Sequence, residues 1–207
     1  MGLDPWEAAL DRARFKARIR GVLNVEIRQG DAGAMVFGDE QFDLVVSNLG
    51  LNNFGDPDAA VAECRRVMKP AARLALTTNL QGHMGEFYEV FESTLRGLGR
   101  VVALDALKKH VNHRATVEGV GALLERNGLR VTRVLEEATS MRFADGAALF
   151  RHYFIQLGFL EGWKGVVDPR EAEEVFSRLE KELDGLAESR GELSLSIPMA
   201  YVEAERI

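Results

Sequence analysis

The sequence predicts an α/β fold built on an open, largely parallel sheet. Strand-like apolar runs alternate with helix-like segments, and the connections between them are short. The clearest strand is the compact apolar run at 42–47 (FDLVVS), which is typical of a strand buried on both faces. In the next segment, Val61, Cys64 and Val67 are spaced for a helix with one buried face.

The remaining elements follow from local signals. Asp56-Pro57-Asp58 is typical of a helix start, and Pro70 ends that helix. Asn127-Gly128 is a left-handed helix stop, and Pro198 places the later part of the last strand at an edge or bulge. The expected elements are helices at 6–20, 86–95 and 116–126, two helices between 145 and 190, and strands at 25–28, 74–78, 129–135 and 193–200.

Composition limits the function classes. The chain has 207 residues, 46% of them hydrophobic and 28% charged, which is ordinary for one soluble domain over residues 1–207. A net charge of −6 provides no basic field for nucleic acid, so a small molecule or a carried metabolite is the expected partner. No apolar run reaches a membrane span, and the single cysteine, Cys64, reads as a small buried residue in a reducing cytoplasm.

Ligands of an open parallel sheet bind beyond the carboxyl ends of its strands, and three such loops carry polar residues. The first is Gly2-Leu3-Asp4-Pro5-Trp6, where Asp4 can accept from ribose hydroxyls or serve as a helix N-cap. In the second, 29–32, Gly30 lets the backbone approach a flat ligand and Asp31 can accept from an exocyclic amine. The third is 47–54, whose asparagines and glycine line a pocket floor or form turns.

Taken together, these motifs resemble a known family. Four segments carry the resemblance: GLDPWEAALDRAR, VEIRQGDA, FDLVVSNLGLNNFGDPDAAVAECRRVMKP and RLALTT. In this order they are similar to the middle of a class I S-adenosylmethionine (SAM)-dependent methyltransferase, a family with a Rossmann-like sheet. The resemblance covers residues 1–80 motif by motif, which would be the cofactor-side half. It implies helical caps for the substrate at 81–113 and 144–190.

The resemblance assigns roles at both ends of the cofactor SAM. Asp4 would bind the ribose hydroxyls, while Asp31 would hold the adenine amine. The residues bordering the adenine would be Pro5, Trp6 and Ala9, with a backbone contact from Ala32. Beside the methionine part and the sulfonium would lie Asn48 and Leu49.

Two departures from the family stand out. The family begins with a central strand and a glycine-rich turn, and this chain starts after both, so the resemblance implies a gap in the sheet. The absent segment has three explanations: an internal start codon, replacement of the segment by another subunit, or a remnant without catalysis. The first is preferred. In the second departure, Lys69-Pro70-Ala71-Ala72 replaces the glycines usual after the proline, so the turn is reshaped or mildly strained.

All four histidines lie in the second half, where the resemblance places the substrate pocket. The candidate catalytic residues there are His83, Tyr88 and His152, and the candidate substrate-binding residues are His113, Arg151 and Tyr153. The cluster Arg151-His152-Tyr153-Phe154 places a cation and aromatic rings on one cap, which suits a carboxylate acceptor, although Arg151 could also simply pair with a nearby acid. No third ligand completes His110 and His113, so no metal site is predicted.

The leading hypothesis is an enzyme that methylates a small or carrier-bound molecule with SAM. A catalytically inactive binding or scaffold subunit is the alternative from another class, because the glycine-rich loop is absent. A nicotinamide-dependent oxidoreductase fits less well, since it does not explain Gln29-Gly30-Asp31-Ala32 before the FDLVVSN strand. The sequence is compatible with a homodimer, and neither a membrane nor nucleic acid is expected as a partner.

Overall fold

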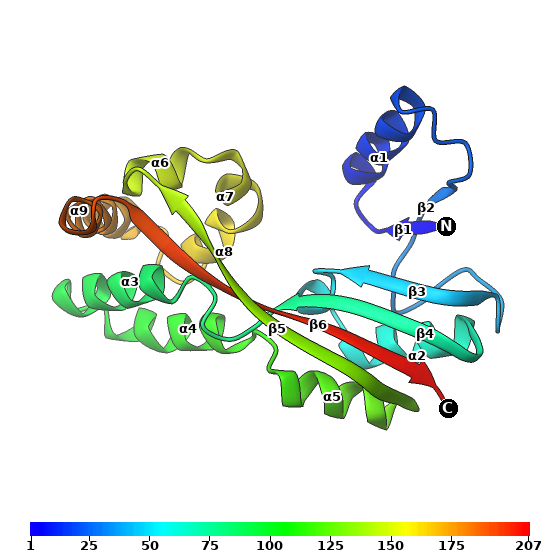
Figure 1. Cartoon of the computed structure of the whole chain (residues 1–207). Coiled ribbons are helices and arrows are strands. Elements are labelled where there is room, and N and C mark those ends of the chain that lie inside the picture. Colours follow the sequence, from blue (N-terminus) through cyan, green and yellow to red (C-terminus); the bar gives the residue numbers. More distant parts are fainter. The chain divides into compact units, whose positions relative to one another are not determined.

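The computed structural model describes all residues, 1–207, and confirms the α/β architecture (Figure 1). The chain divides into two compact units. Unit 1 holds residues 1–78, 117–135 and 201–207, and unit 2 holds residues 79–116 and 136–200. Most of the predicted cofactor-side half therefore lies in unit 1, and both predicted cap segments lie within unit 2. No helix is long and apolar enough to cross a bilayer.

Unit 1 opens with a small parallel strand pair. Strand β1 (Gly2–Asp4) pairs with β2 (Ile27–Gln29), and helix α1 (Glu7–Ile19) connects them. The structure confirms the helix expected at 6–20, and it places the strand expected at 25–28 slightly later. Only Leu10 of α1 is buried, so this first segment has little core of its own.

A second sheet has the order β3-β4-β6-β5 and is not hydrogen bonded to the first. Its strands are β3 (Phe42–Asn48), β4 (Met68–Asn79), β6 (Leu193–Arg206) and β5 (Leu129–Phe143). Strands β3 and β4 run parallel, while β5 and β6 contribute residues to both units. Strands β1 and β3 therefore each keep an unpaired edge.

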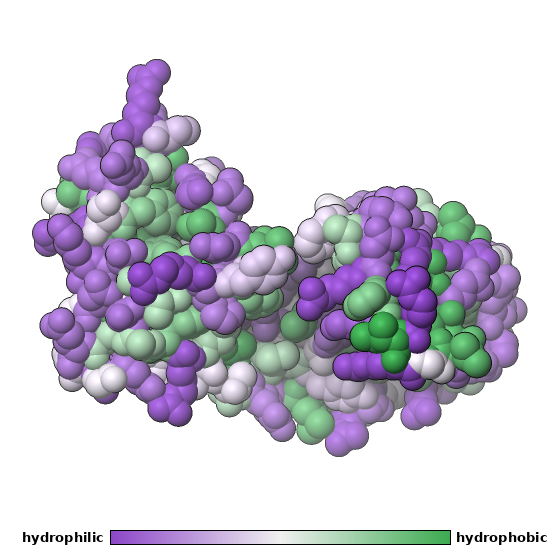
Figure 2. Space-filling view, turned by 90° about the horizontal axis from the view of Figure 1, so that it is seen from above, coloured by the Kyte–Doolittle hydropathy of each residue, from purple (hydrophilic) through white to green (hydrophobic).

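The prediction that FDLVVS is buried on both faces is wrong. No residue of β3 is buried, and Leu44 and Val46 are 51% and 66% exposed. Strand β3 is also the edge of its sheet and has one neighbour, so it is not the central, doubly covered strand that its composition predicts. Most exposed large hydrophobic side chains of unit 1 lie within residues 1–46, and strongly hydrophobic side chains are visible on this unit in Figure 2 (right).

Helix α2 (Pro57–Val67) begins where the sequence predicts, after the short 3-10 helix η1 (Leu51–Asn53). The Asp56 carboxylate accepts the Ala59 N–H at 3.0 Å, and Pro57 occupies the first turn. Helix α5 (Val117–Arg126) is fixed against α2 because Arg126 donates to both oxygens of Asp58, at 2.6 and 2.5 Å.

Two further local predictions in unit 1 are confirmed. Gly128 has a φ of +73° directly after α5, as the Asn127-Gly128 stop requires. Cys64 is 6% exposed, and burial raises the pKa of its thiol to about 11. The small buried cysteine is therefore a packing residue that stays protonated at neutral pH.

The Pro70 turn is strained, as expected from its alanines. Helix α2 ends at Val67, and Ala71 has a φ of +59°, a left-handed conformation that favours glycine. The pairing of β3 with β4 shifts register here, because Phe42 faces Met68 and Leu44 faces Arg73. The extra residues of β4 form an irregularity at the start of the strand.

Unit 2 is mainly helical around one aromatic core. Phe87 and Trp163 are fully buried and stack with ring centroids 4.0 Å apart. Four helices occupy the region where two were predicted, so that prediction is wrong, and α4 was not predicted as a separate helix. The helices of the unit are α3 (Gly85–Gly97), α4 (Val101–Asn112), α6 (Gly146–Arg151), α7 (Tyr153–Gly158), α8 (Leu160–Lys164) and α9 (Ala172–Arg190).

Pro198 does not mark a sheet edge, since β6 lies between β4 and β5. Proline lacks only the N–H donor, and the Pro198 carbonyl still accepts the Leu80 N–H at 2.9 Å. The edge interpretation was wrong because an inner strand can hold a proline whose acceptor remains in use.

Candidate active site

Asp4 and Asp31 lie at the same end of the β1–β2 pair. The parallel register pairs Asp4 with Gln29, and the Gly30 N–H donates to the Asp4 carbonyl at 3.2 Å. Asp31 follows two residues after Gln29, so both carboxylates belong to the loops at the carboxyl ends of neighbouring strands. This is the edge at which open α/β sheets bind nucleotides.

Each of these carboxylates is oriented by its own loop. The Trp6 N–H donates to Asp4 Oδ1 at 2.8 Å, and the Gly33 N–H donates to Asp31 Oδ1 at 2.7 Å. Trp6, not Asp4, is the N-cap of α1, so the N-cap interpretation of Asp4 is wrong. The second oxygen of each carboxylate has no hydrogen-bond partner within the chain and can accept from a ligand.

Gly30 serves packing inside the strand pair. A Cβ at this position would lie 2.7 Å from Leu3 Cδ1, which is too close for a real contact. The glycine therefore makes room for Leu3, which explains it without the close ligand approach that the sequence suggested.

Two of the residues predicted to border the adenine, Pro5 and Trp6, directly follow Asp4 in the first loop. Trp6 is 53% exposed, which leaves its indole face open to a ligand. The Pro5 carbonyl accepts from Gln29 Nε2 at 3.1 Å, so the first loop is tied to the second strand. Ala9 and Ala32 are half-buried.

The third loop starts with a strained residue. Leu49 follows β3 with a φ of +58°, which a leucine rarely adopts. Its N–H donates to both the carbonyl and the hydroxyl oxygen of Thr77, at 3.0 and 3.1 Å. The Thr77 hydroxyl in turn donates to Asn48 Oδ1 at 2.6 Å. Thr77 of β4 thus holds both residues that the resemblance assigns to the methionine part, and strain of this kind is common at binding sites.

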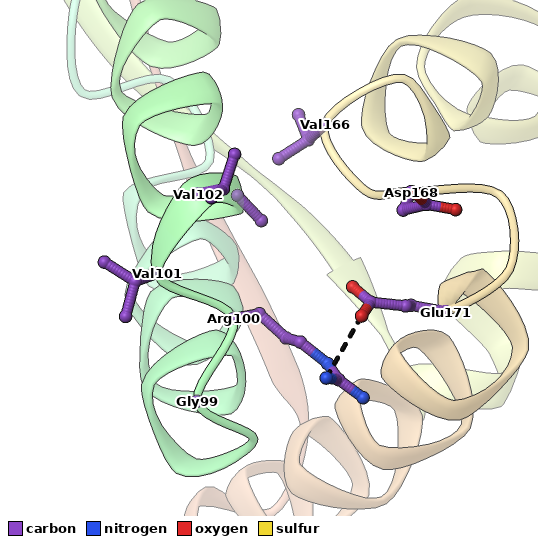
Figure 3. A pocket seen from close by; sticks show the side chains of 8 residues that line it. Gly99, Arg100, Val101, Val102, Val166, Asp168 and Glu171 are labelled. Carbon is purple, nitrogen blue, oxygen red and sulfur yellow. Dashed lines mark ion pairs between the residues drawn. The ribbon is translucent and has the colours of Figure 1, made fainter.

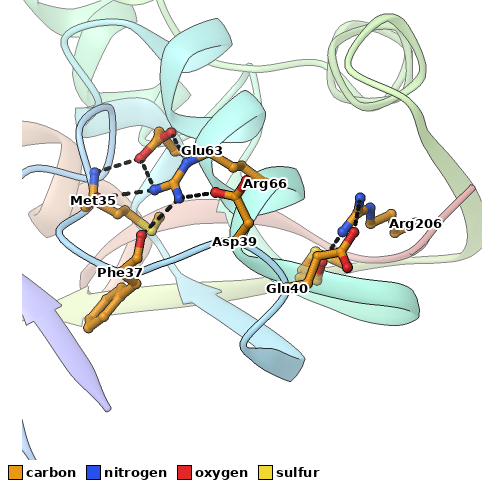
Figure 4. A network of polar contacts seen from close by, with 8 residues as sticks. Met35, Phe37, Asp39, Glu40, Glu63, Arg66 and Arg206 are labelled. Carbon is orange, nitrogen blue, oxygen red and sulfur yellow. Dashed lines mark hydrogen bonds and ion pairs between the residues drawn. The ribbon is translucent and has the colours of Figure 1, made fainter.

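Arg66 anchors the segment between Asp31 and β3 (Figure 4). Its guanidinium donates to the carbonyls of Met35 and Phe37 at 3.1 and 2.8 Å, and it pairs with Glu63 and Asp39. The pKa of Arg66 is raised by its hydrogen bond to Glu63, and the pKa of Glu63 is lowered by the same contact. Arg66 remains charged and fixes the loop after Asp31 to α2.

Two of the predicted catalytic residues, His83 and Tyr88, lie in the interior of unit 2. His83 is 4% exposed and stacks on Phe159, with centroids 5.7 Å apart and planes 10° apart. The Tyr88 hydroxyl accepts from Trp163 Nε1 at 3.1 Å and lies 3.3 Å from His110 Nε2. A chain of aromatic contacts through Phe159 and Trp163 links the two residues.

The other predicted acceptor-site residues divide between two places. The exposed His113 lies beside His110, with ring centroids 5.5 Å apart and its Nδ1 against the His110 carbonyl. Arg151, His152 and Tyr153 are exposed at the junction of α6 and α7, and the His152 ring meets the edge of Phe143. No hydrogen bond or ion pair connects these three residues to His83 or Tyr88.

Sequence reasoning did not single out several residues of these sites. Thr77 and Phe159 contact the predicted residues Asn48 and His83, and Arg114 lies over the ring of Phe159. Thr77 and Phe159 are far in sequence from the residues that they contact, and Arg114 has no distinctive local pattern. Only the position of Thr77 in the LALTT strand, which precedes a predicted pocket segment, could have indicated it.

A separate cavity of about 330 Å³ lies at the start of α4 (Figure 3). Arg100 points to Glu171 at 3.0 Å and also pairs with Glu174 at 2.7 Å, so its charge is matched. None of the predicted site residues lines this cavity.

Comparison with known proteins identifies the first segment. Residues 1–76 match a family model described as a methyltransferase domain. The first segment of the chain is therefore similar to a methyltransferase domain. The matched residues include the motifs that resemble the class I SAM-dependent methyltransferases.

Curated relatives match only part of this chain. A ubiquinone/menaquinone biosynthesis C-methyltransferase (UbiE) of Psychromonas ingrahamii is 34% identical over 105 residues, which are 48% of this chain and 42% of that protein. The corresponding protein of Idiomarina loihiensis is 33% identical with the same coverage. The match therefore spans less than half the length of these relatives.

Solved structures support the fold over the whole chain. The YcgJ protein of Bacillus subtilis has a TM-score of 0.60 at 17% identity, covering 99% of this chain and 81% of that one. A SAM-dependent methyltransferase of Methanosarcina mazei has a TM-score of 0.57 at 16% identity, covering 100% and 81%.

Proposed function

We propose that this chain is a SAM-dependent methyltransferase for a small or carrier-bound acceptor, including carboxylates. The observation that carries the proposal is the placement of Asp4 and Asp31 at the ends of two paired strands, each with one oxygen fixed and the other without a partner. These carboxylates fit the ribose hydroxyls and the adenine amine of SAM.

The other cofactor residues follow the same arrangement. The exposed Trp6, with Pro5, would cover the adenine. Asn48 and Leu49, held by Thr77, would lie beside the methionine part. SAM supplies a methyl group on a sulfonium, and the protein has to align the acceptor and remove a proton only if the acceptor carries one.

His83, Tyr88 and His152 are the proposed groups for such a proton, with His113, Arg151 and Tyr153 as acceptor contacts. Burial, followed by the charge of Arg114, lowers the pKa of His83 to about 4. Its imidazole is therefore neutral at pH 7 and can accept a proton, though as a weak base. A carboxylate acceptor would need no base, because its oxygen attacks the methyl carbon as the carbon–sulfur bond breaks.

One observation favours a second candidate, a catalytically inactive binding subunit. Strand β3 keeps a free edge with exposed Leu44 and Val46 next to the loop assigned to the cofactor. Such an edge pairs readily with another strand. In this case the chain would fold and associate without binding SAM.

Calorimetry with S-adenosylhomocysteine separates the two candidates. Asp31→Asn keeps an oxygen for the Gly33 N–H but replaces the free acceptor by an amide donor, so affinity should fall about 10- to 100-fold, or about 1–3 kcal/mol. Asp105→Asn, which removes an exposed charge in unit 2, is the matched control and should leave the affinity unchanged. Absence of binding by the folded wild type would favour the inactive subunit, and equal affinities of wild type and D31N would remove the role of Asp31.

A further inference from the structure

Arg114 is an arginine of unit 2 without a counter-ion. Two arginines of this unit are half-buried, Arg100 and Arg114. Arg100 pairs with two glutamates, whereas none of the ion pairs of the chain involves Arg114. The Arg114 guanidinium instead lies 5.9 Å from the centroid of the Phe159 ring. A half-buried cation that lacks an acid is available to an anionic ligand.

His83 lies beside the same Phe159 ring, and one of its ring nitrogens lacks a hydrogen-bond partner. Its side chain is almost fully buried, yet Nδ1 has no hydrogen-bond partner. A buried polar atom without a partner costs about 1–3 kcal/mol, so such atoms call for an explanation. His83 and Arg114 thus lie against the same ring, 5.7 and 5.9 Å from the centroid of Phe159. The pKa of His83 is lowered by burial and then by the positive charge of Arg114.

The surroundings favour an anion with a flat apolar body. The ionisable neighbours of this cluster are His110 and His113, together with Tyr88, and no carboxylate acts on His83 or His110. Both imidazoles are disfavoured in their charged form, first by burial and then by nearby positive charge. The ring of Phe159 meets His83 by stacking and the half-exposed Phe154 edge to face, at 5.7 and 5.5 Å.

We propose that Arg114 and His83, beside the ring of Phe159, form a binding site for a small carboxylate with a planar apolar body. Arg114 supplies the charge, and the Nδ1 N–H of neutral His83 donates to the carboxylate. The aromatic rings cover the apolar part. This site goes beyond the proposed methyl transfer, because its occupation does not depend on SAM.

Binding of benzoate, followed by NMR without SAM, tests the site. Benzoate should bind in the millimolar range usual for a ligand of this size and should perturb the His83 ring signals. A bound anion stabilises the imidazolium, so the pKa of His83 should rise by about one pH unit at saturation. Benzamide, which has the same shape without charge, should bind at least about tenfold more weakly.

Substitutions then locate the site. Arg114→Gln should weaken benzoate binding about tenfold or more, and Arg114→Lys, which keeps the charge but not the planar guanidinium, should weaken it less. Arg170→Gln removes an exposed, unpaired arginine of the same unit and is the matched control. Equal binding by R114Q and R170Q, equal binding of benzamide and benzoate, or no binding up to about 10 mM would overturn the proposal. None of these outcomes affects the calorimetric test of the proposed function.

Discussion

Thr77→Val probes the loop assigned to the methionine part of SAM. The change keeps the shape of the side chain and removes the hydroxyl that donates to Asn48 Oδ1 and accepts from the Leu49 N–H, at 2.6 and 3.1 Å. Two hydrogen bonds of about 1 kcal/mol each are lost. The net loss of folding stability is only about 1 kcal/mol, because the Leu49 N–H still donates to the Thr77 carbonyl and the exposed Asn48 side chain can hydrogen bond to water.

We expect Thr77→Val to reduce the affinity for the cofactor more than it reduces folding stability. Leu49 holds a left-handed conformation that costs about 1–2 kcal/mol in free peptides, so fewer contacts leave this loop less ordered before SAM arrives. We expect T77V to lower the midpoint of thermal unfolding slightly and to weaken S-adenosylhomocysteine about tenfold in calorimetry. Thr77→Ser keeps the hydroxyl and should retain the affinity. If T77V and T77S bind equally well, the hydroxyl does not organise the loop.

Two further predictions concern strain and protonation. Ala71→Gly should raise stability by about 1 kcal/mol, measured by urea unfolding, because glycine adopts the φ of +59° without strain; a loss of stability would contradict the strain at this turn. The folded pKa of His83, about 4, lies below its unfolded value of about 6.5, so the stability it contributes is full above pH 6.5 and is lost as the pH falls toward 4. Between pH 7 and pH 4 the wild type should lose on the order of 2 kcal/mol of stability through His83, and His83→Gln should not show this loss when thermal unfolding is followed over the same range. If the variant has the same pH dependence as the wild type, a buried neutral imidazole is refuted.

Local chemistry was read correctly from the sequence. Asp56 caps α2, Gly128 stops α5, and the alanine after Pro70 carries the strain expected where glycine is usual. Each of these features depends on a few consecutive residues, so the chain itself contains the information.

Features that depend on distant neighbours were not predicted. The composition of FDLVVS is that of a central strand, and only the sheet order shows that β3 is an edge. The same limit applies to Pro198, whose strand lies inside the sheet. Arg114 and His83 converge through the loop after α4 and the ring of Phe159, and no sequence spacing links them.

The family motifs gave the cofactor residues their roles, and the geometry adds how each is held. Asp4 and Asp31 are oriented by backbone N–H groups, and Arg66 secures the segment after Asp31. Preorganised acceptors of this kind lower the cost of ordering a ligand.

A crystal structure of the chain with S-adenosylhomocysteine addresses the cofactor site most directly. We expect the ribose hydroxyls to donate to Asp4 and the adenine amine to donate to Asp31. A nucleoside bound away from both carboxylates, or contacts with only one of them, would contradict the assignment.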